Sequence, residues 1–127
     1  MNCVVCNEPM VVLESDKVEI DHCLFCGGIW LDSGEMEILL EDPKEAQEAM
    51  VRFAANRESE RSSRRCPICR KKMQTTRPDA DGKVEIDRCP RDHGLWFDRG
   101  ELEKVIRIFD KDNNNRVVKL LEDMFKE

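Results

Sequence analysis

Seven cysteines and one of two histidines occur in a spacing typical of zinc-binding proteins. Zinc in a structural site takes four thiolate or imidazole ligands in a tetrahedron, and a two-residue gap allows one tight turn to present two sulfurs to one ion. Spacing alone does not choose between zinc and iron, because rubredoxin-like centres use similar turns. The first predicted site consists of two Cys-x-x-Cys pairs separated by sixteen residues: Cys3, Cys6, Cys23 and Cys26.

The second predicted site replaces its last cysteine with a histidine. Alignment of the two halves of the chain puts Asp92 opposite Cys26 and His93 opposite Gly27. An imidazole reaches further from its backbone than a thiolate, and zinc sites of this kind favour nitrogen or sulfur, so we rank His93 above Asp92. This Cys3His set favours zinc, and we expect two structural Zn2+ ions per chain. The predicted ligands of this site are Cys66, Cys69, Cys89 and His93.

Four protein ligands at each ion predict structural rather than catalytic zinc. Catalytic zinc keeps a coordination position open for water or substrate. The sequence offers no nucleophile beside a base and no phosphate-binding glycine loop, and the Cys-x-x-Cys pairs lack the flanking βαβ pattern of thioredoxin-like enzymes. We therefore expect no enzyme, and a thiol or zinc redox sensor is a lesser alternative.

Both quartets belong to a sequence repeat. Lys-Val-Glu-Ile-Asp at 17–21 recurs at 83–87, and Trp-x-Asp-x-Gly-Glu at 30–35 recurs at 96–101. Each half of this 127-residue chain is too small to build a robust core without a staple, which the metal would supply. The predicted organisation is module one at 1–41, a helical linker at 42–63, module two at 64–109 and a helical tail at 110–127.

Local patterns predict a small metal-stabilised α+β fold. The apolar runs at 10–13 and 29–31 and the alternating apolar and charged residues at 18–21 predict short strands. Asp32 with Glu35 matches a capping box that opens a helix to about residue 41. Asp98 and Glu101 repeat this pattern. The prediction is two zinc-ribbon modules, each a short antiparallel sheet followed by a helix, joined by a linker helix. Trp30 and Trp96 are expected to pack over the metal hairpins, with His22 at the surface.

The linker and the tail are each predicted to carry an amphipathic helix. Asp42-Pro43 is a helix start, and Ala46 and Ala49 begin an apolar stripe along the linker. Residues 58–65 are expected to form a solvated hinge. Homo-oligomerisation through helices at 43–57 and 116–126 is left open.

Charge is unevenly distributed over a chain of net charge −6. This balance excludes a uniformly basic nucleic-acid-binding surface, although the stretch 61–77 is rich in lysine and arginine and could neutralise phosphates. No apolar run is long enough for a membrane helix, and the first residues lack signal-peptide features, so we expect a cytoplasmic protein. The candidate nucleic-acid-binding residues are Arg61, Arg64, Arg65, Arg70, Lys71, Lys72 and Arg77.

The order Cys-x-x-Cys, hairpin, Cys-x-x-Cys-Gly-Gly-x-Trp-Leu-Asp-x-Gly-Glu resembles the transcription factor zinc-finger domains, which are likened to the zinc ribbon of transcription factor IIB. Residues 3–40 resemble the family closely, and residues 66–106 depart from it at His93. The resemblance implies bound zinc and a role associated with transcription. The sequence therefore favours a non-catalytic interaction module that binds a protein partner, with nucleic-acid binding through 61–77 as the alternative.

Overall fold

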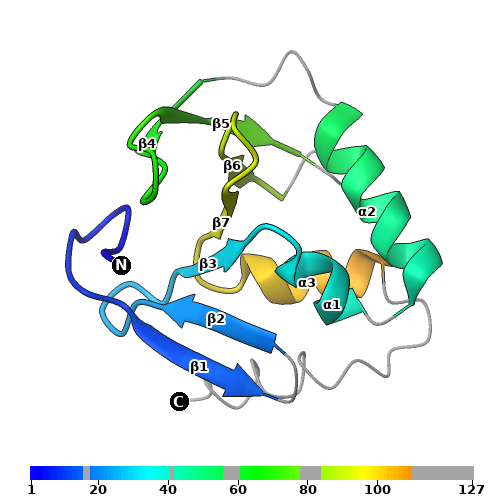
Figure 1. The fold of residues 1–127 in the computed structure, drawn as a ribbon, viewed down its shortest axis with the longest axis horizontal. Helices are drawn as coiled ribbons and strands as arrows, with labels where there is room; N and C mark the ends of the chain where they lie inside the picture. Colours follow the sequence, from blue (N-terminus) through cyan, green and yellow to red (C-terminus); the bar gives the residue numbers. More distant parts are fainter. Residues whose placement is uncertain (16–17, 41, 56–60, 78–83, 110–127) are drawn as a thin grey trace.

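The computed structural model describes residues 1–15, 18–40, 42–55, 61–77 and 84–109 (Figure 1). The strands of this part of the chain are β1 (Val11–Ser15), β2 (Val18–His22), β3 (Ile29–Asp32), β4 (Arg61–Arg65), β5 (Lys72–Thr76), β6 (Ile86–Arg88) and β7 (Gly94–Phe97). Its helices are α1 (Glu35–Leu40), α2 (Pro43–Ala55) and α3 (Glu101–Phe109).

The strands of both modules form one antiparallel sheet in the order β1-β2-β3-β7-β6-β5-β4. The sequence predicted a short sheet for each module, and the structure joins these sheets through β3 and β7, which lie side by side at the centre (Figure 1). Each of these strands covers what would otherwise be an exposed edge of the other module. The two modules are therefore halves of a single folded unit.

The central strand pair has a local two-fold symmetry. Trp30 lies opposite Trp96 in the β3–β7 register, and these tryptophans occupy equivalent positions in the sequence repeat. A Cβ atom added to Gly28 would overlap the Trp96 ring, and one added to Gly94 would overlap the Trp30 ring. Each tryptophan thus packs on the glycine of the other module, and only glycine leaves room for it.

The main hydrophobic core combines strand and helix residues from both modules. Helices α1, α2 and α3 contact one another, because their apolar faces point toward a shared interior. A core common to both repeats means that neither half buries its apolar side chains alone. The buried residues of this cluster include Ile20, Leu31, Leu39, Leu40, Ala46, Ala49, Ile86, Phe97, Leu102, Val105, Ile106 and Phe109.

A second buried cluster contains the central tryptophans and the first cysteine of every predicted ligand pair. Trp30 and Trp96 are each at most 1% exposed, as the prediction of packed rather than solvent-facing rings requires. This cluster connects the surroundings of the two predicted metal sites through the middle of the sheet. Its members are Cys3, Met10, Cys23, Trp30, Cys66, Met73, Cys89 and Trp96.

Two local predictions were wrong. Residues 61–65 of the expected hinge form β4, which pairs with β5 at the edge of the sheet. Asp32 and Asp98 do not act as side-chain helix caps: their carboxylates accept the indole N–H groups of Trp30 and Trp96, at 2.9 and 3.3 Å. A buried indole N–H requires an acceptor, and this requirement outweighs capping here.

Helix α2 begins where the sequence places a helix start. The Asp42 carboxylate accepts the backbone N–H groups of Lys44 and Glu45, at 2.8 and 3.4 Å. Ala46 and Ala49 of the predicted apolar stripe are buried within this chain, so they are not available to a second copy. The predicted tail helix at 116–126 and residues 56–57 lie outside the described residues.

Candidate metal centres

Each ligand pair lies on a tight hairpin that the backbone closes in the same way. The N–H of the first cysteine donates to the carbonyl five residues later: Cys3 to Glu8, Cys23 to Gly28, Cys66 to Lys71 and Cys89 to Gly94, at 2.8–3.1 Å. This shared closure fixes the direction in which the side chains of each turn project. Four hairpins that share this outer hydrogen bond therefore supply the candidate ligands of both sites.

The left-handed residue of the fourth hairpin comes one position early. Asn7, Gly27 and Arg70 have positive φ angles four residues after the first cysteine, whereas Asp92, at φ 60°, comes three residues after Cys89. The Asp92 N–H correspondingly donates to the Cys89 carbonyl at 3.0 Å. This tighter turn accounts for the one-residue displacement of the final ligand from Asp92 to His93.

The structure places the predicted ligands of site one together at one end of the sheet. One ligand atom from each of Cys3, Cys6, Cys23 and Cys26 lies within 4.8 Å of the other three. The Cys3 and Cys26 sulfurs are 3.6 Å apart, which is too far for a disulfide and close to the edge of about 3.8 Å expected for four sulfurs around zinc. All seven cysteines are free thiols.

Site two brings three sulfurs around a histidine ring nitrogen. The Nδ1 atom of His93 lies 3.5 Å from the Cys89 sulfur and 3.8 Å from the Cys66 sulfur, and the Cys69 and Cys89 sulfurs are 3.6 Å apart. All four ligand atoms lie within 4.8 Å of one another. Nδ1, rather than Nε2, is thus the ring nitrogen that faces the site, and the donor set suits zinc.

Asp92, the weaker candidate for the fourth ligand, faces away from this site. Its carboxylate forms an ion pair with Arg88 at 2.6 Å, and its side chain is 71% exposed. We predict that Asp92→Ala retains two zinc ions per chain, whereas His93→Ala loses site two. His93→Cys should keep both ions, because a thiolate is an equivalent zinc ligand.

Zinc content by elemental analysis of the three variants checks this prediction. Loss of zinc from Asp92→Ala, or full retention in His93→Ala, would reject the Cys3His assignment.

Backbone N–H groups are directed at the ligand sulfurs. Val5 and Cys6 donate to the Cys3 sulfur, at 3.4 and 3.3 Å, and Ile68 and Arg91 donate to the Cys66 and Cys89 sulfurs, each at 3.4 Å. Hydrogen bonds of this kind stabilise a thiolate, which is the form that binds metal. The hairpins therefore prepare the sulfurs for a cation.

Two thiols of site two differ in acidity. A hydrogen bond from the Lys71 backbone lowers the pKa of Cys69 to about 6, whereas burial raises the pKa of Cys66 to about 11. Cys69 is thus a thiolate at neutral pH, and Cys66 gives up its proton when a metal ion binds.

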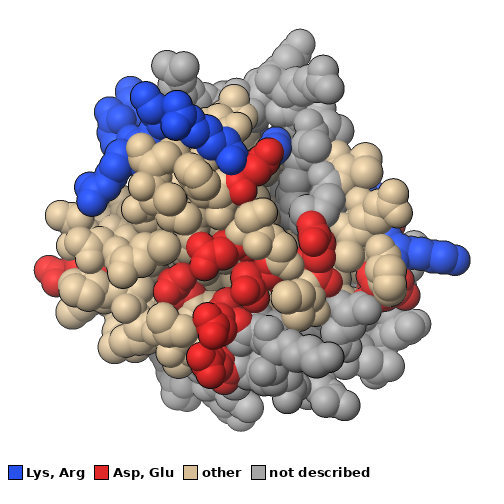
Figure 2. Space-filling view, viewed as in Figure 1, with Lys and Arg blue, Asp and Glu red and all other residues tan. Residues whose placement is uncertain are grey.

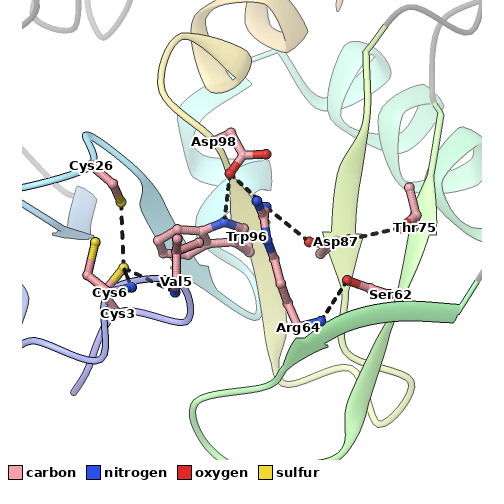
Figure 3. A network of polar contacts seen from close by, with 10 residues as sticks. All are labelled: Cys3, Val5, Cys6, Cys26, Ser62, Arg64, Thr75, Asp87, Trp96 and Asp98. Carbon is pink, nitrogen blue, oxygen red and sulfur yellow. Dashed lines mark hydrogen bonds and ion pairs between the residues drawn. The ribbon is translucent and has the colours of Figure 1, made fainter.

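The tryptophan–aspartate contacts are a feature of the site that sequence reasoning missed. Trp96 lies beside the cysteines of site one, and its indole N–H points to Asp98 (Figure 3). The signal was present in the sequence as Trp-x-Asp in both repeats, but the capping interpretation used the aspartates differently. These contacts orient the rings that connect the two sites.

His22 is buried at 7% exposure, so its expected surface position was wrong. It lies in β2 directly before Cys23, and burial lowers the pKa of its imidazole. It is not part of either ligand group.

The basic stretch 61–77 is divided by its contacts. The Arg64 side chain is 32% exposed and pairs with Asp98 at 2.7 Å and with Asp87 at 3.5 Å (Figure 3), and Arg77 pairs with Glu85 at 2.9 Å. Burial raises the pKa of Asp87, which the nearby guanidinium opposes. The structure does not bring the six described basic side chains of this stretch together as one surface. Four of them are exposed: Arg65, Arg70, Lys71 and Lys72. The side chain of Arg61 lies outside the described residues.

Comparison with known proteins gives a family and no individual relative. Residues 2–42 and 65–108 match the family described as transcription factor zinc-finger, which accounts for more than half of the chain. No curated protein and no solved structure matches the chain significantly. In the described part of the chain, no helix has both the length and the apolar character needed to cross a membrane. With its two matched segments each carrying a zinc site, the chain belongs to the transcription factor zinc-finger family.

Proposed function

We propose that the protein is a non-catalytic interaction module, acting as a protein-binding adaptor or a transcription-associated regulator in the cytoplasm. The observation that carries this proposal is the exposure of apolar side chains on the hairpins of site one. Leu24 and Phe25 are 70% and 75% exposed, and Val5 on the other hairpin of the same site is 49% exposed. Large apolar side chains held in solvent by a rigid turn are typical of docking surfaces.

The closed ligand sets support a structural rather than a catalytic role for zinc. Each group contains four protein ligands, and four such ligands satisfy tetrahedral zinc without water or substrate. Zinc would then hold the hairpins, and the hairpins would present their tips to a partner.

The proposal predicts that a partner depends on the site-one tips. Purified protein is used to capture partners from an extract of its source cells, with crosslinking and mass spectrometry. We expect Leu24→Ser/Phe25→Ser to lose the captured partner, because truncating exposed apolar anchors removes most of the binding free energy of a small interface. Val12→Ser/Val51→Ser is the matched control, since these residues are 57% and 60% exposed on β1 and α2.

A partner retained by Leu24→Ser/Phe25→Ser, or lost equally from the control, would contradict docking through the site-one tips. Two zinc ions per chain in both variants would show that the hairpins are intact.

Nucleic-acid binding through the stretch 61–77 is the second candidate. Figure 2 shows lysine and arginine side chains gathered over the β4 side of the molecule, and Arg65, Arg70, Lys71 and Lys72 are its described exposed residues. Such a surface predicts binding to oligonucleotides that weakens steeply as salt is added. Arg64 is already paired with Asp98, and this pairing reduces the number of phosphates that the surface could neutralise.

A further inference from the structure

A groove of about 670 Å3 lies between the two modules, beside both zinc sites. Residues 1–5 and 7, around the first hairpin of site one, form one wall. Residues 63–67 and 70, from β4 and the first hairpin of site two, form the other wall. This volume is within the range of about 300–1,000 Å3 that is typical of ligand-binding clefts.

The two walls differ in charge. Arg64, Arg65 and Arg70 line the β4 wall, whereas the opposite wall consists of apolar and uncharged polar side chains apart from Cys3, whose sulfur belongs to site one. Asp87 and Asp98 neutralise Arg64 through ion pairs, so outside the two metal sites the uncompensated side-chain charge of the groove is carried by Arg65 and Arg70. In Figure 2 the basic surface at the upper left lies directly above a mostly uncharged surface, which has acidic side chains at its edges.

The Arg65 side chain of this wall is hydrogen-bonded to the neighbouring hairpin. The Arg65 guanidinium donates to the Arg70 carbonyl at 3.1 Å, and Arg70 itself occupies the positive-φ position of its hairpin. Both side chains are exposed. A guanidinium positioned in this way still has N–H groups free for a carboxylate, which it binds in a planar, bidentate arrangement.

The apolar side chains favour a peptide over a nucleic acid as the occupant. Val4, Val5 and Pro67 line the groove, and of the described residues around it none is aromatic. Single-stranded nucleic acids are bound by stacking their bases on aromatic side chains, for which this groove offers no platform. Aliphatic side chains of a peptide could instead pack on the valines while its carboxylates meet the arginines.

We propose that this groove binds a peptide segment of a partner protein in which carboxylates alternate with aliphatic side chains. The inference rests on the proposed function as an interaction module and specifies the chemistry of the partner. The groove is distinct from the Leu24–Phe25 tip, so the partner would have two points of attachment.

Fluorescence anisotropy of the zinc-loaded full chain tests the proposal. The probes are a short fluorescein-labelled peptide of glutamate and leucine, its lysine and leucine counterpart, and a labelled single-stranded oligonucleotide. We expect the acidic peptide to bind and the basic peptide not to bind. Arg65→Glu/Arg70→Glu should weaken acidic-peptide binding by about tenfold or more, because it replaces attraction with repulsion at the contact. Val5→Glu, on the opposite wall, should also weaken it.

Lys71→Glu/Lys72→Glu is the matched control. It changes the net charge by the same amount within the same basic stretch, but neither lysine lines the groove. We expect it to alter acidic-peptide binding by no more than about threefold, since exposed charges outside a contact are screened by salt. Zinc content of two per chain is required of each variant before its binding is compared.

Absence of acidic-peptide binding, or equal weakening by the two double variants, would overturn the proposal. Tight oligonucleotide binding that depends on Arg65 and Arg70 would assign the groove to nucleic acid instead. A partner captured through Leu24 and Phe25 and unaffected by Arg65→Glu/Arg70→Glu would refute the groove while leaving the interaction module standing. Failure to capture any partner that depends on Leu24 and Phe25 would refute the proposed function itself.

Discussion

Removing zinc with a strong chelator under reducing conditions is expected to unfold both halves of the chain together. Structural zinc contributes about 10–16 kcal/mol of apparent binding free energy at a site of this kind, whereas a small domain is stable by only about 5–15 kcal/mol. The two sites are connected by the cluster around Trp30 and Trp96, and the modules share a sheet and a core. Unfolding caused by loss of the ions should therefore extend over both modules.

The measurement is amide dispersion in a two-dimensional NMR spectrum, with tryptophan fluorescence in parallel. Both tryptophans are buried, so their emission should shift to longer wavelength as the amide signals collapse. Two equivalents of zinc should restore the native spectrum. A chelated protein that kept a dispersed spectrum would show that the apolar core, rather than the metal, holds the fold.

A variant that lacks one ligand of site one tests whether the two modules unfold together or independently. Cys23→Ser removes one ligand of site one, and we expect amide signals from residues 84–109 to lose dispersion along with those from module one. Asp92→Ala, which removes an exposed side chain next to a ligand, is the control and should leave the spectrum intact. Selective loss of module one would contradict the cooperative unit that we infer from the shared sheet.

Gly94→Ala is expected to destabilise the protein by about 3 kcal/mol or more. A Cβ atom at this position would overlap the backbone carbonyl of Leu31 on the neighbouring strand as well as the Trp30 ring. A flexible side chain can move away from such an overlap, but a paired strand cannot do so without breaking its register. The substitution therefore acts on the β3–β7 contact that joins the modules.

Gly34→Ala is the matched control for this prediction. Gly34 has a φ of +93°, and a Cβ atom there would have no neighbour within 4 Å. Its cost is backbone strain of about 1–2 kcal/mol. Urea denaturation of both variants measures the difference in the free energy of unfolding. Equal destabilisation would mean that the strand contact at Gly94 adjusts at no cost, and that the central pairing is looser than its register indicates.

The ligand pattern and the local strands could be predicted from the sequence because both depend on spacing within one module. Cys-x-x-Cys pairs require a tight turn, and alternation such as Val-Glu-Ile-Asp requires a strand with one buried face. The helix start at Asp42 is likewise a local signal, and the structure shows its carboxylate bound to backbone N–H groups. Local chemistry of this kind is independent of where the second module lies.

The joining of the modules could not be predicted from the same patterns. Pairing of β3 with β7 depends on contacts between residues 62 to 68 positions apart, such as Trp30 and Trp96, and no sequence periodicity reports on them. The roles of Asp32 and Asp98 were missed for a related reason. Once the indoles are buried between the modules, their N–H groups need acceptors, and this need arises only in the assembled fold. The strand at 61–65 also depends on tertiary contacts, because Arg64 on this strand forms ion pairs with Asp87 and Asp98.

The local two-fold axis at Trp30 and Trp96 makes this chain a covalent counterpart of a symmetric homodimer. In a homodimer of one ribbon, both subunits would present the same surface. Two repeats in one polypeptide are free of this constraint, since a substitution in one repeat need not occur in the other. The apolar turn Leu24–Phe25 and its polar counterpart Pro90–Arg91 have diverged in this way, although their hairpins close alike. Two repeats in one polypeptide can thus present different side chains on equivalent hairpins at a fixed spacing.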